Sequence, residues 1–438
     1  MTERKSAAIS VNQRLGSILI RGGRVIDPAQ KFDAPADVLL RDGKVAEVGA
    51  VSGTADTVID ASGLIVAPGF IDLHVHLREP GQWQKETIAS GTMAAAAGGF
   101  TCVCTMPNTL PINDLPAITR WVKEPERGAR VDVFPVAAAS VASQGQRLTD
   151  YFALAKAGAV AVSDDGLPLL EDRIMREALR AAAAVGLPIM QHAEDTRLTE
   201  GCTMTEGATA FRLGLHGMPA RAESSIVARD IELARETGGH LHVCHLSTAG
   251  ALEAVRLGKR WGVRVTCEAA PHHFTLTDED VIPYDTRFKM NPPLRSQADR
   301  EAVLAGLADG TIDAIATDHA PHAPHEKAVE FDRAPSGIIG LETAFPLAIT
   351  ELHLRRGISL SRIVELLSSN PARILGKSDR GTLAPGARAN VTIFNPAKRW
   401  RYEAAKGHSK AQNTPFDGWQ FTGKISTTIV DGQVVYSD

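Results

Sequence analysis

The sequence predicts an α/β protein: a (β/α)8 TIM barrel with a small β-sandwich domain formed from the N- and C-terminal segments. Three observations support this prediction. Eight short apolar, β-branched runs recur through the middle of the chain, helix-like segments lie between most of them, and both chain ends carry short alternating runs broken by Gly and Asp. Eight βα units in succession are typical of a (β/α)8 barrel.

The two chain ends have the same β texture. Their apolar and polar residues alternate as in half-buried strands, and the step "RDGK" at residues 41–44 is a hairpin signal. Two ends of matching character are expected to form one unit. We therefore assign residues 1–68 and 381–438 to a small β domain and residues 69–380 to the barrel.

The middle of the chain supplies the eight expected barrel strands. Helix-like segments such as 172–186 and 224–239 separate them. In such barrels the functional groups lie at the C-terminal ends of the strands. In chain order the expected strands are GFIDLHVHL, TCVCTMPN, VDVFPVAAAS, AVAVSDDG, LPIMQHAED, HLHVCHLS, VRVTCEAAPHH and DAIATDHAP.

Composition narrows the class of protein. The formal net charge is only −4, so no basic excess favours a nucleic-acid partner. No apolar run approaches the length of a membrane span, and the first residues lack the apolar core of a secretory signal. We expect a cytoplasmic protein that acts on a small molecule, with no nucleic-acid or membrane partner.

Ionisable or amide side chains stand at the end of most expected strands, and the barrel would gather them at one mouth. Side chains on a strand alternate in direction, so every second residue from Asp72 to Arg78 is expected to point into the barrel. The aliphatic residues between them, and Ile71, are expected to pack against helices. The strand-end residues are His74, His76, Arg78, Asn108, Asp164, Asp165, His192, His245 and Asp318.

Four imidazoles and two carboxylates exceed the three protein ligands that a catalytic zinc commonly takes. We expect two metals: His74, His76 and Asp318 on the first, and His192 and His245 on the second. A carboxylate from the fourth strand would bridge them, together with a hydroxide whose pKa falls toward ~7 on coordination. Imidazole-rich sites favour zinc, although the ligand types also suit nickel or manganese.

The bridging carboxylate is expected to be Asp165. Along "AVAVSDD", Val160, Val162 and Asp164 share one face and Asp165 lies on the other. Bulky valine usually meets the helices, which turns Asp165 inward. The remaining histidines lack comparable placement and are expected to be structural, with His272 and His273 at the end of the seventh strand either structural or supporting the site.

These residues resemble the amidohydrolase superfamily and, more narrowly, the bacterial class I dihydroorotases. The resemblance implies reversible cyclisation of N-carbamoyl-L-aspartate to (S)-dihydroorotate with loss of water, in de novo pyrimidine (UMP) biosynthesis, with two zinc ions per subunit. It also implies a homodimer and allows a complex with aspartate transcarbamoylase. The matching motifs, in family order from about residue 63 to 419, are GFIDLHVHLREPG, TMPNT, SDDG, QHAED, HVCHLST, CEAAPHH, KMNPPLR, ATDHAPH, GIIGLETAF and NTPFDGW.

The resemblance also implies roles for individual residues. Asp318 would be the general base and acid as well as a ligand, and the planar fork of Arg78 suits a substrate carboxylate. Ser336 stands where the family pattern predicts an aromatic side chain. The implied zinc ligands are His74, His76, Asp165, His192, His245 and Asp318; the implied substrate contacts are His76, Arg78, Asn108, Asn291, His322, Ser336 and Gly337.

Two alternatives remain open. Allantoinases, hydantoinases and dihydropyrimidinases are related, but many of them bridge their metals with a carboxylated lysine from the fourth strand, and this chain has no lysine between Lys156 and Lys259. They also act on neutral rings, which do not require Arg78 and Asn108 as a carboxylate clamp. A non-catalytic dihydroorotase-like partner of aspartate transcarbamoylase would typically lack some of the ligands, whereas all six are present. The loop after Asp318 is expected to cover a bound ligand.

Overall fold

The computed structural model describes residues 16–438, so the first 15 residues of the expected small domain lie outside the described residues. Eight parallel strands form the barrel sheet, in the order β15-β14-β13-β10-β9-β8-β7-β6. A parallel bridge between Val75 and His319 brings its two edges together. The predicted barrel is therefore confirmed. Its strands are β6 (Phe70–Val75), β7 (Phe100–Thr105), β8 (Asp132–Ala138), β9 (Ala161–Ser163), β10 (Ile189–Gln191), β13 (Leu241–Val243), β14 (Val265–Ala269) and β15 (Ala314–Ile315).

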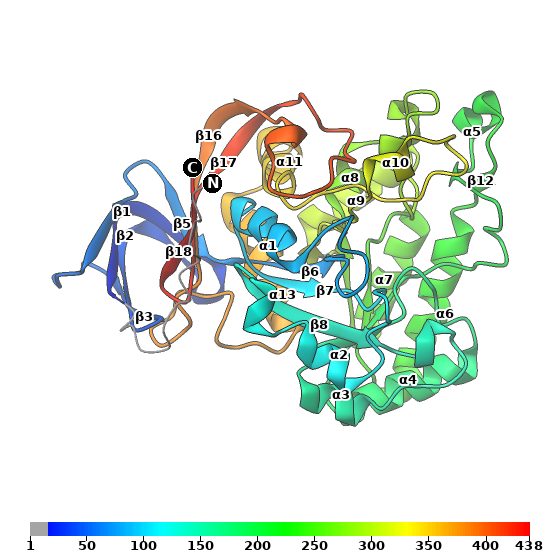
Figure 1. The fold of residues 1–438 in the computed structure, drawn as a ribbon, viewed down its shortest axis with the longest axis horizontal. Coiled ribbons are helices and arrows are strands. Elements are labelled where there is room, and N and C mark those ends of the chain that lie inside the picture. The colour runs from blue at the N-terminus through cyan, green and yellow to red at the C-terminus, as the bar shows by residue number, and fades with distance from the viewer. Residues whose placement is uncertain (1–15) are drawn as a thin grey trace, which may run out of the picture.

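Helices follow the strands and cover the outside of the barrel (Figure 1). Several begin at a side-chain cap: Thr87, Thr248 and Ser296 each accept a hydrogen bond from the backbone N–H three residues ahead. No helix among the described residues is long and apolar enough to cross a membrane. The main helices are α1 (Ile88–Ala97), α2 (Pro116–Trp121), α3 (Tyr151–Ala157), α4 (Asp172–Ala184), α6 (Arg221–Thr237), α7 (Ala249–Arg260), α9 (Gln297–Asp309), α11 (Ala344–Ala348), α12 (Leu360–Val364) and α13 (Asn370–Ile374); shorter ones are α5 (Ala208–Leu213), α8 (Pro271–Thr275) and α10 (Pro324–Lys327).

The two chain ends form one further sheet, in the order β18-β17-β16-β5-β1-β2-β3, with β4 paired to β1. Figure 1 shows its blue N-terminal strands beside the orange and red C-terminal strands, at one end of the barrel. The expected hairpin at residues 41–44 is present, with Asp42 and Gly43 at positive φ. The strands are β1 (Ile18–Asp27), β2 (Phe32–Arg41), β3 (Lys44–Gly49), β4 (Thr57–Asp60), β5 (Ile65–Pro68), β16 (Val391–Arg401), β17 (Gln420–Val430) and β18 (Gln433–Ser437).

A separate apolar core supports the division into two units. It combines residues from both chain ends, including Ile18, Val38, Leu383 and Ile429. β5 ends at Pro68 and β6 begins at Phe70, so a single residue joins the small sheet to the barrel. We retain the boundaries given above as our proposed domain division.

The alternation expected along the first barrel strand is wrong in its first half. Ile71 and Leu73 belong to the buried cluster that fills the barrel, not to the cluster beneath the helices. Asp72 instead accepts hydrogen bonds at Oδ1 from the backbone N–H groups of His74 and Thr317, at 3.1 and 3.0 Å. The pairing of β6 with β7 contains an irregularity between Asp72 and Val75 that accommodates one extra residue, and beyond it the histidines point inward.

Candidate functional site

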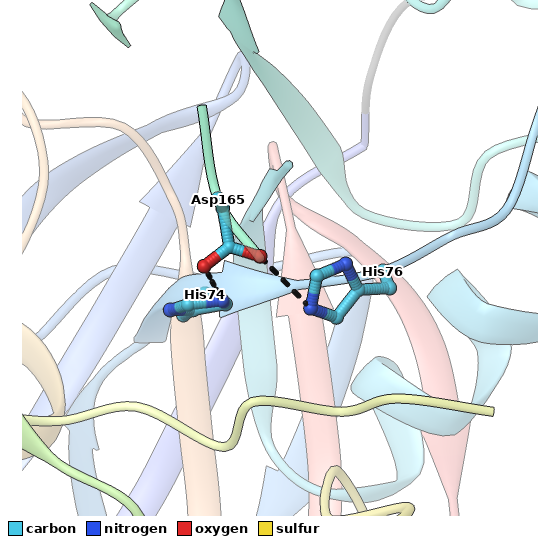
Figure 2. Close-up of side chains that lie close together, drawn as sticks. All are labelled: His74, His76 and Asp165. Atoms are coloured by element: carbon cyan, nitrogen blue, oxygen red, sulfur yellow. Dashed lines mark ion pairs between the residues drawn. The ribbon is translucent and has the colours of Figure 1, made fainter. Parts of the chain in front are cut away.

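Six buried side chains from five strand ends meet at the mouth of the barrel: His74, His76, Asp165, His192, His245 and Asp318. Asp165 approaches the pair on β6, with Oδ1 3.3 Å from His74 Nε2 and Oδ2 3.5 Å from His76 Nε2 (Figure 2). Asp318 Oδ1 lies 3.1 Å from His76 Nε2 and 3.5 Å from His74 Nε2. Both carboxylates therefore face the same two imidazoles.

Asp165 also faces the second pair of imidazoles. Its Oδ1 lies 3.9 Å from His192 Nδ1 and 3.7 Å from His245 Nε2, and those two nitrogens are 3.1 Å apart. Asp164 is turned elsewhere, because its Oδ1 accepts a hydrogen bond from the backbone N–H of Ser140 at 2.9 Å. Asp165 is therefore the fourth-strand carboxylate that lies between the two histidine pairs.

The donor set fits divalent cations. Among the described residues, His74 Nε2 and Asp165 Oδ1 are buried without a hydrogen-bond partner, and unpaired buried polar atoms are costly unless something else binds them. Burial opposes the ionisation of Asp165, but the neighbouring His74, His245 and His76 outweigh it and hold the pKa of the carboxyl well below its ordinary value. Overlapping sets of three potential ligand atoms lie within 4.8 Å of one another: His74, His76 and Asp165; His74, His245 and Asp318; and Asp165, His192 and His245.

A buried carboxylate that the sequence reasoning missed fixes the orientation of His74. Glu268, on β14, lies with Oε1 3.1 Å from His74 Nδ1 and Oε2 3.0 Å from His242 Nε2. Burial alone would raise its pKa, yet the hydrogen bonds from His242 and His74 lower it to about 2. An ionised carboxylate only accepts, so Nδ1–H of His74 donates to Glu268, which turns Nε2 toward the site. His242, expected to be merely structural, supports this arrangement.

A second missed carboxylate, Glu194, supports His192 in the same way. Its Oε2 lies 2.9 Å from His192 Nε2 and accepts from Asn291 Nδ2 at 2.9 Å, while Oε1 accepts from the hydroxyl of Thr199. Burial opposes its ionisation, but these hydrogen bonds and the charge of His192 lower its pKa to about 2. The only sequence signal for this contact was the spacing of Glu194 two residues after His192, which places both on one face of an extended chain.

Five of the six side chains, all but His74, line a cavity of about 240 Å³. That volume suits a small molecule. Gly337, an expected substrate contact, is not among the lining residues, and its N–H donates to the carbonyl of Lys289 at 2.9 Å. Its φ of 156° and the 2.6 Å from a built Cβ to the Ala320 carbonyl oxygen explain why a glycine occupies this position. The other expected substrate contacts, His76, Arg78, Asn108, Asn291, His322 and Ser336, all line the cavity.

Arg78 is a buried cation in the cavity wall. Its Nε donates to the carbonyl of Pro321 at 3.1 Å, and no carboxylate among residues 16–438 lies within 4.0 Å of its guanidinium. Burial lowers its pKa to about 10, which still leaves it protonated near neutral pH. A buried cation without an anionic partner is costly, so the cavity is suited to an anion.

Other groups in the wall are positioned by the protein. Asn108 accepts at Oδ1 from Nδ1–H of His76 at 2.9 Å. His322 donates from Nε2 to the carbonyl of Ser336 at 2.8 Å, and burial together with the charge of Arg78 lowers its pKa to about 3.

Three residues of the site have backbone φ angles in the left-handed region: 63° for Arg78, 32° for His245 and 47° for Asp318. Non-glycine residues rarely adopt such angles, and backbone strain of this kind clusters at functional sites.

Comparisons with known protein families, sequences and structures all find matches named dihydro-orotase-like, dihydroorotase or hydantoinase. A family model described as dihydro-orotase-like matches residues 63–251. Proteins named dihydroorotase from Geobacter sp. (strain M21) and Solibacter usitatus are 52% and 50% identical over 96% of this chain, covering 99% and 98% of their own lengths. Among solved structures, an L-hydantoinase (dihydropyrimidinase) from Arthrobacter aurescens superposes with a TM-score of 0.85 at 25% identity over 96% of each chain.

Proposed function

The chain belongs to the dihydroorotase-like family, and we propose that it catalyses the reversible cyclisation of N-carbamoyl-L-aspartate to (S)-dihydroorotate with loss of water, a step of pyrimidine biosynthesis. One observation carries the proposal: four imidazoles and two carboxylates converge beside Arg78, a buried cation with no acidic partner in the described chain. The imidazoles and carboxylates suit metal-assisted amide chemistry. Arg78 suits a substrate that carries a carboxylate.

We propose that two zinc ions are the cofactor. When bound, they would polarise the amide carbonyl and lower the pKa of a water molecule. Imidazole nitrogen and carboxylate oxygen are donors that zinc accepts well. The proposed ligands are His74, His76, Asp165, His192, His245 and Asp318.

The chain's own residues would bind the substrate and move its protons. Arg78 is positioned to grip the substrate α-carboxylate with two parallel N–H donors, and His322 lines the same cavity. In the hydrolytic direction, Asp318 takes the proton of the attacking water. It then gives a proton to the ureido nitrogen as the ring C–N bond breaks. In the biosynthetic direction, Asp318 removes that ureido proton while the nitrogen attacks the side-chain carboxyl carbon and water leaves.

A hydantoinase or dihydropyrimidinase activity is the main competing proposal, because structures with those names share the fold. Arg78 argues against that activity, because the ring substrates of hydantoinases and dihydropyrimidinases carry no carboxylate. The test is a comparison of kcat/KM for dihydroorotate, hydantoin, dihydrouracil and allantoin under identical conditions. We expect dihydroorotate to exceed each of the others by at least about 100-fold, the discrimination available when a site leaves a buried charge unpaired with the wrong substrate. A higher value for any neutral ring would refute the proposal.

We also propose a homodimer, on the basis of the family resemblance, which in addition allows a complex with aspartate transcarbamoylase. Light scattering of the purified protein is expected to give twice the chain mass.

A purely scaffolding relative would carry little metal, so metal analysis of protein purified without added zinc separates the scaffold from the enzyme. Near-stoichiometric zinc supports the enzyme.

A further inference from the structure

We propose that Lys327 is a positioning residue whose ammonium ties the loop of residues 322–336 to the segment of residues 286–291, so that the walls of the cavity keep a fixed separation. The inference rests on the proposed function and adds a positioning element to it. The sequence predicts that the loop after Asp318 covers a bound ligand. With this tie in place, the loop would be a permanent wall of the cavity and not a lid that opens in each turnover.

Lys327, the last residue of α10, is a buried cation that is held by backbone carbonyls alone. It is 8% exposed, and its Nζ donates to the carbonyls of Thr286 at 3.0 Å and Pro335 at 2.8 Å. The carbonyl of Lys289 lies 3.4 Å from the same nitrogen, and no carboxylate among residues 16–438 lies within 4.0 Å of it. An ammonium has three donors, so these three carbonyls satisfy it. The carbonyls come from both stretches of chain, and the ammonium therefore joins them.

A second lysine makes the reverse connection, from the segment to the loop. Lys289 is 7% exposed, and its Nζ donates to the carbonyls of Phe331 at 2.7 Å and Asp332 at 2.9 Å. Its own carbonyl accepts from the N–H of Gly337 at 2.9 Å. The two stretches are thus connected at several points along the loop, and a lid that swings open would have to break these contacts together.

The residues next to these contacts face the proposed substrate. Ser336 follows Pro335 in the chain, and Ser336, His322 and Asn291 all line the cavity. His322 Nε2 donates to the carbonyl of Ser336 at 2.8 Å, so a shift of Ser336 would move His322 as well. Misplacing a substrate-positioning group by about 1 Å can cost on the order of 100-fold in rate. Lys327 is not among the lining residues, so it would act only through these neighbours.

The direct test is Lys327→Met, which keeps the length of the side chain and removes the ammonium. Burial, with the charge of Lys289, lowers the pKa of Lys327 to about 7, so the comparison is made at about pH 6.5, where the ammonium predominates. We expect KM for dihydroorotate to rise at least about tenfold while kcat stays within about threefold, because loosening the walls weakens substrate binding and leaves Asp318 in place. Zinc content should match wild type. An unchanged KM would overturn the inference.

Arg333→Met is the matched control, because it breaks only an exposed ion pair with Glu330, at 3.8 Å, on the same loop. Its KM is expected to stay within about twofold of the wild-type value. A rise equal to that of Lys327→Met would show that any change in the loop has this effect, and it would contradict a specific role for the ammonium.

Chemical rescue guards against misfolding of Lys327→Met and separates the ammonium from simple packing. Lys327→Ala should raise KM in the same way, and propylammonium, which supplies the deleted atoms, should restore it to within about threefold of wild type. Tetramethylammonium, a cation without N–H donors, should not restore it. Rescue by both cations, or by neither, would contradict the inference.

Hydrogen exchange of residues 322–336 tests the fixed wall by a measurement other than kinetics. We expect similar exchange in zinc-loaded wild type with and without dihydroorotate, and exchange at least about tenfold faster in Lys327→Met. A loop that exchanges freely and becomes protected only with dihydroorotate would be a lid, and the inference would fail. If wild type fails to turn over dihydroorotate, the proposed function fails, while the ligand-free comparison of wild type with Lys327→Met still tests the tie.

Discussion

Replacing Arg78 with glutamine should lower activity on dihydroorotate far more than activity on an uncharged ring. Arg78 is only 8% exposed, and no carboxylate of the described chain neutralises it, so its fork would be free to bind the substrate carboxylate. Removing one partner of a buried, hydrogen-bonded charge pair costs about 2–5 kcal/mol. At about 1.4 kcal/mol per factor of ten, kcat/KM should fall roughly 30- to 4,000-fold.

The assay is the ultraviolet loss of dihydroorotate, run beside the hydrolysis of dihydrouracil, which has the same ring without the carboxylate. Arg78→Gln should leave the second reaction nearly unchanged, and Arg78→Lys should lie between wild type and Arg78→Gln because it keeps the charge but loses the fork. Arg173→Gln, which breaks only an exposed ion pair with Glu177, is the matched control. Equal losses on both rings, or none on dihydroorotate, would refute the carboxylate clamp.

Three further predictions concern the base, the support of a ligand and a buried lysine. Asp318→Asn should lower turnover on the order of 10²–10⁴-fold while zinc content stays near wild type, and substantial residual turnover would remove Asp318 from the proton path. Glu268→Gln should weaken metal affinity roughly 10- to 100-fold, measured by zinc release against a chelator, and unchanged retention would contradict its role in orienting His74. Lys327 donates to the carbonyls of Thr286 and Pro335, and burial, with the charge of Lys289, lowers its pKa to about 7. The unfolded chain holds that proton up to about pH 10, so the free energy of unfolding should rise between about pH 7 and 10, by at most about 1.4 kcal/mol per pH unit. Lys327→Met should abolish that rise. A variant that keeps the wild-type dependence of the unfolding free energy on pH would show that another group titrates.

Much of the architecture could be predicted because it depends on local patterns. Each expected barrel strand overlaps an observed strand, since apolar β-branched runs bounded by polar turns carry their own signal. The convergence of the strand-end histidines could be predicted from the barrel topology, which places those strand ends at one mouth. Asp165 was distinguished from Asp164 by the bulk of Val160 and Val162. Val162 packs in the cluster beneath the helices as expected, whereas Val160 packs in the cluster that fills the barrel.

What could not be predicted depends on contacts between distant segments. The extra residue in β6 between Asp72 and Val75 is defined only by its pairing with β7, so strict alternation misplaced Ile71 and Leu73. Glu268 lies 194 residues from the His74 that it supports, and its place within the expected seventh barrel strand does not reveal that contact. The contact expected between Gly337 and the substrate stays a prediction; in the structure its N–H donates to the carbonyl of Lys289 at 2.9 Å.

The most direct measurement is dihydroorotate turnover by one protein sample as purified, after chelation, and after zinc is restored. We expect strong turnover, its loss together with the bound metal, and its recovery at about two zinc ions per chain. Turnover that survives complete metal removal, or a zinc-loaded protein inert toward dihydroorotate, would contradict the claim that these convergent histidines and aspartates form the reaction centre.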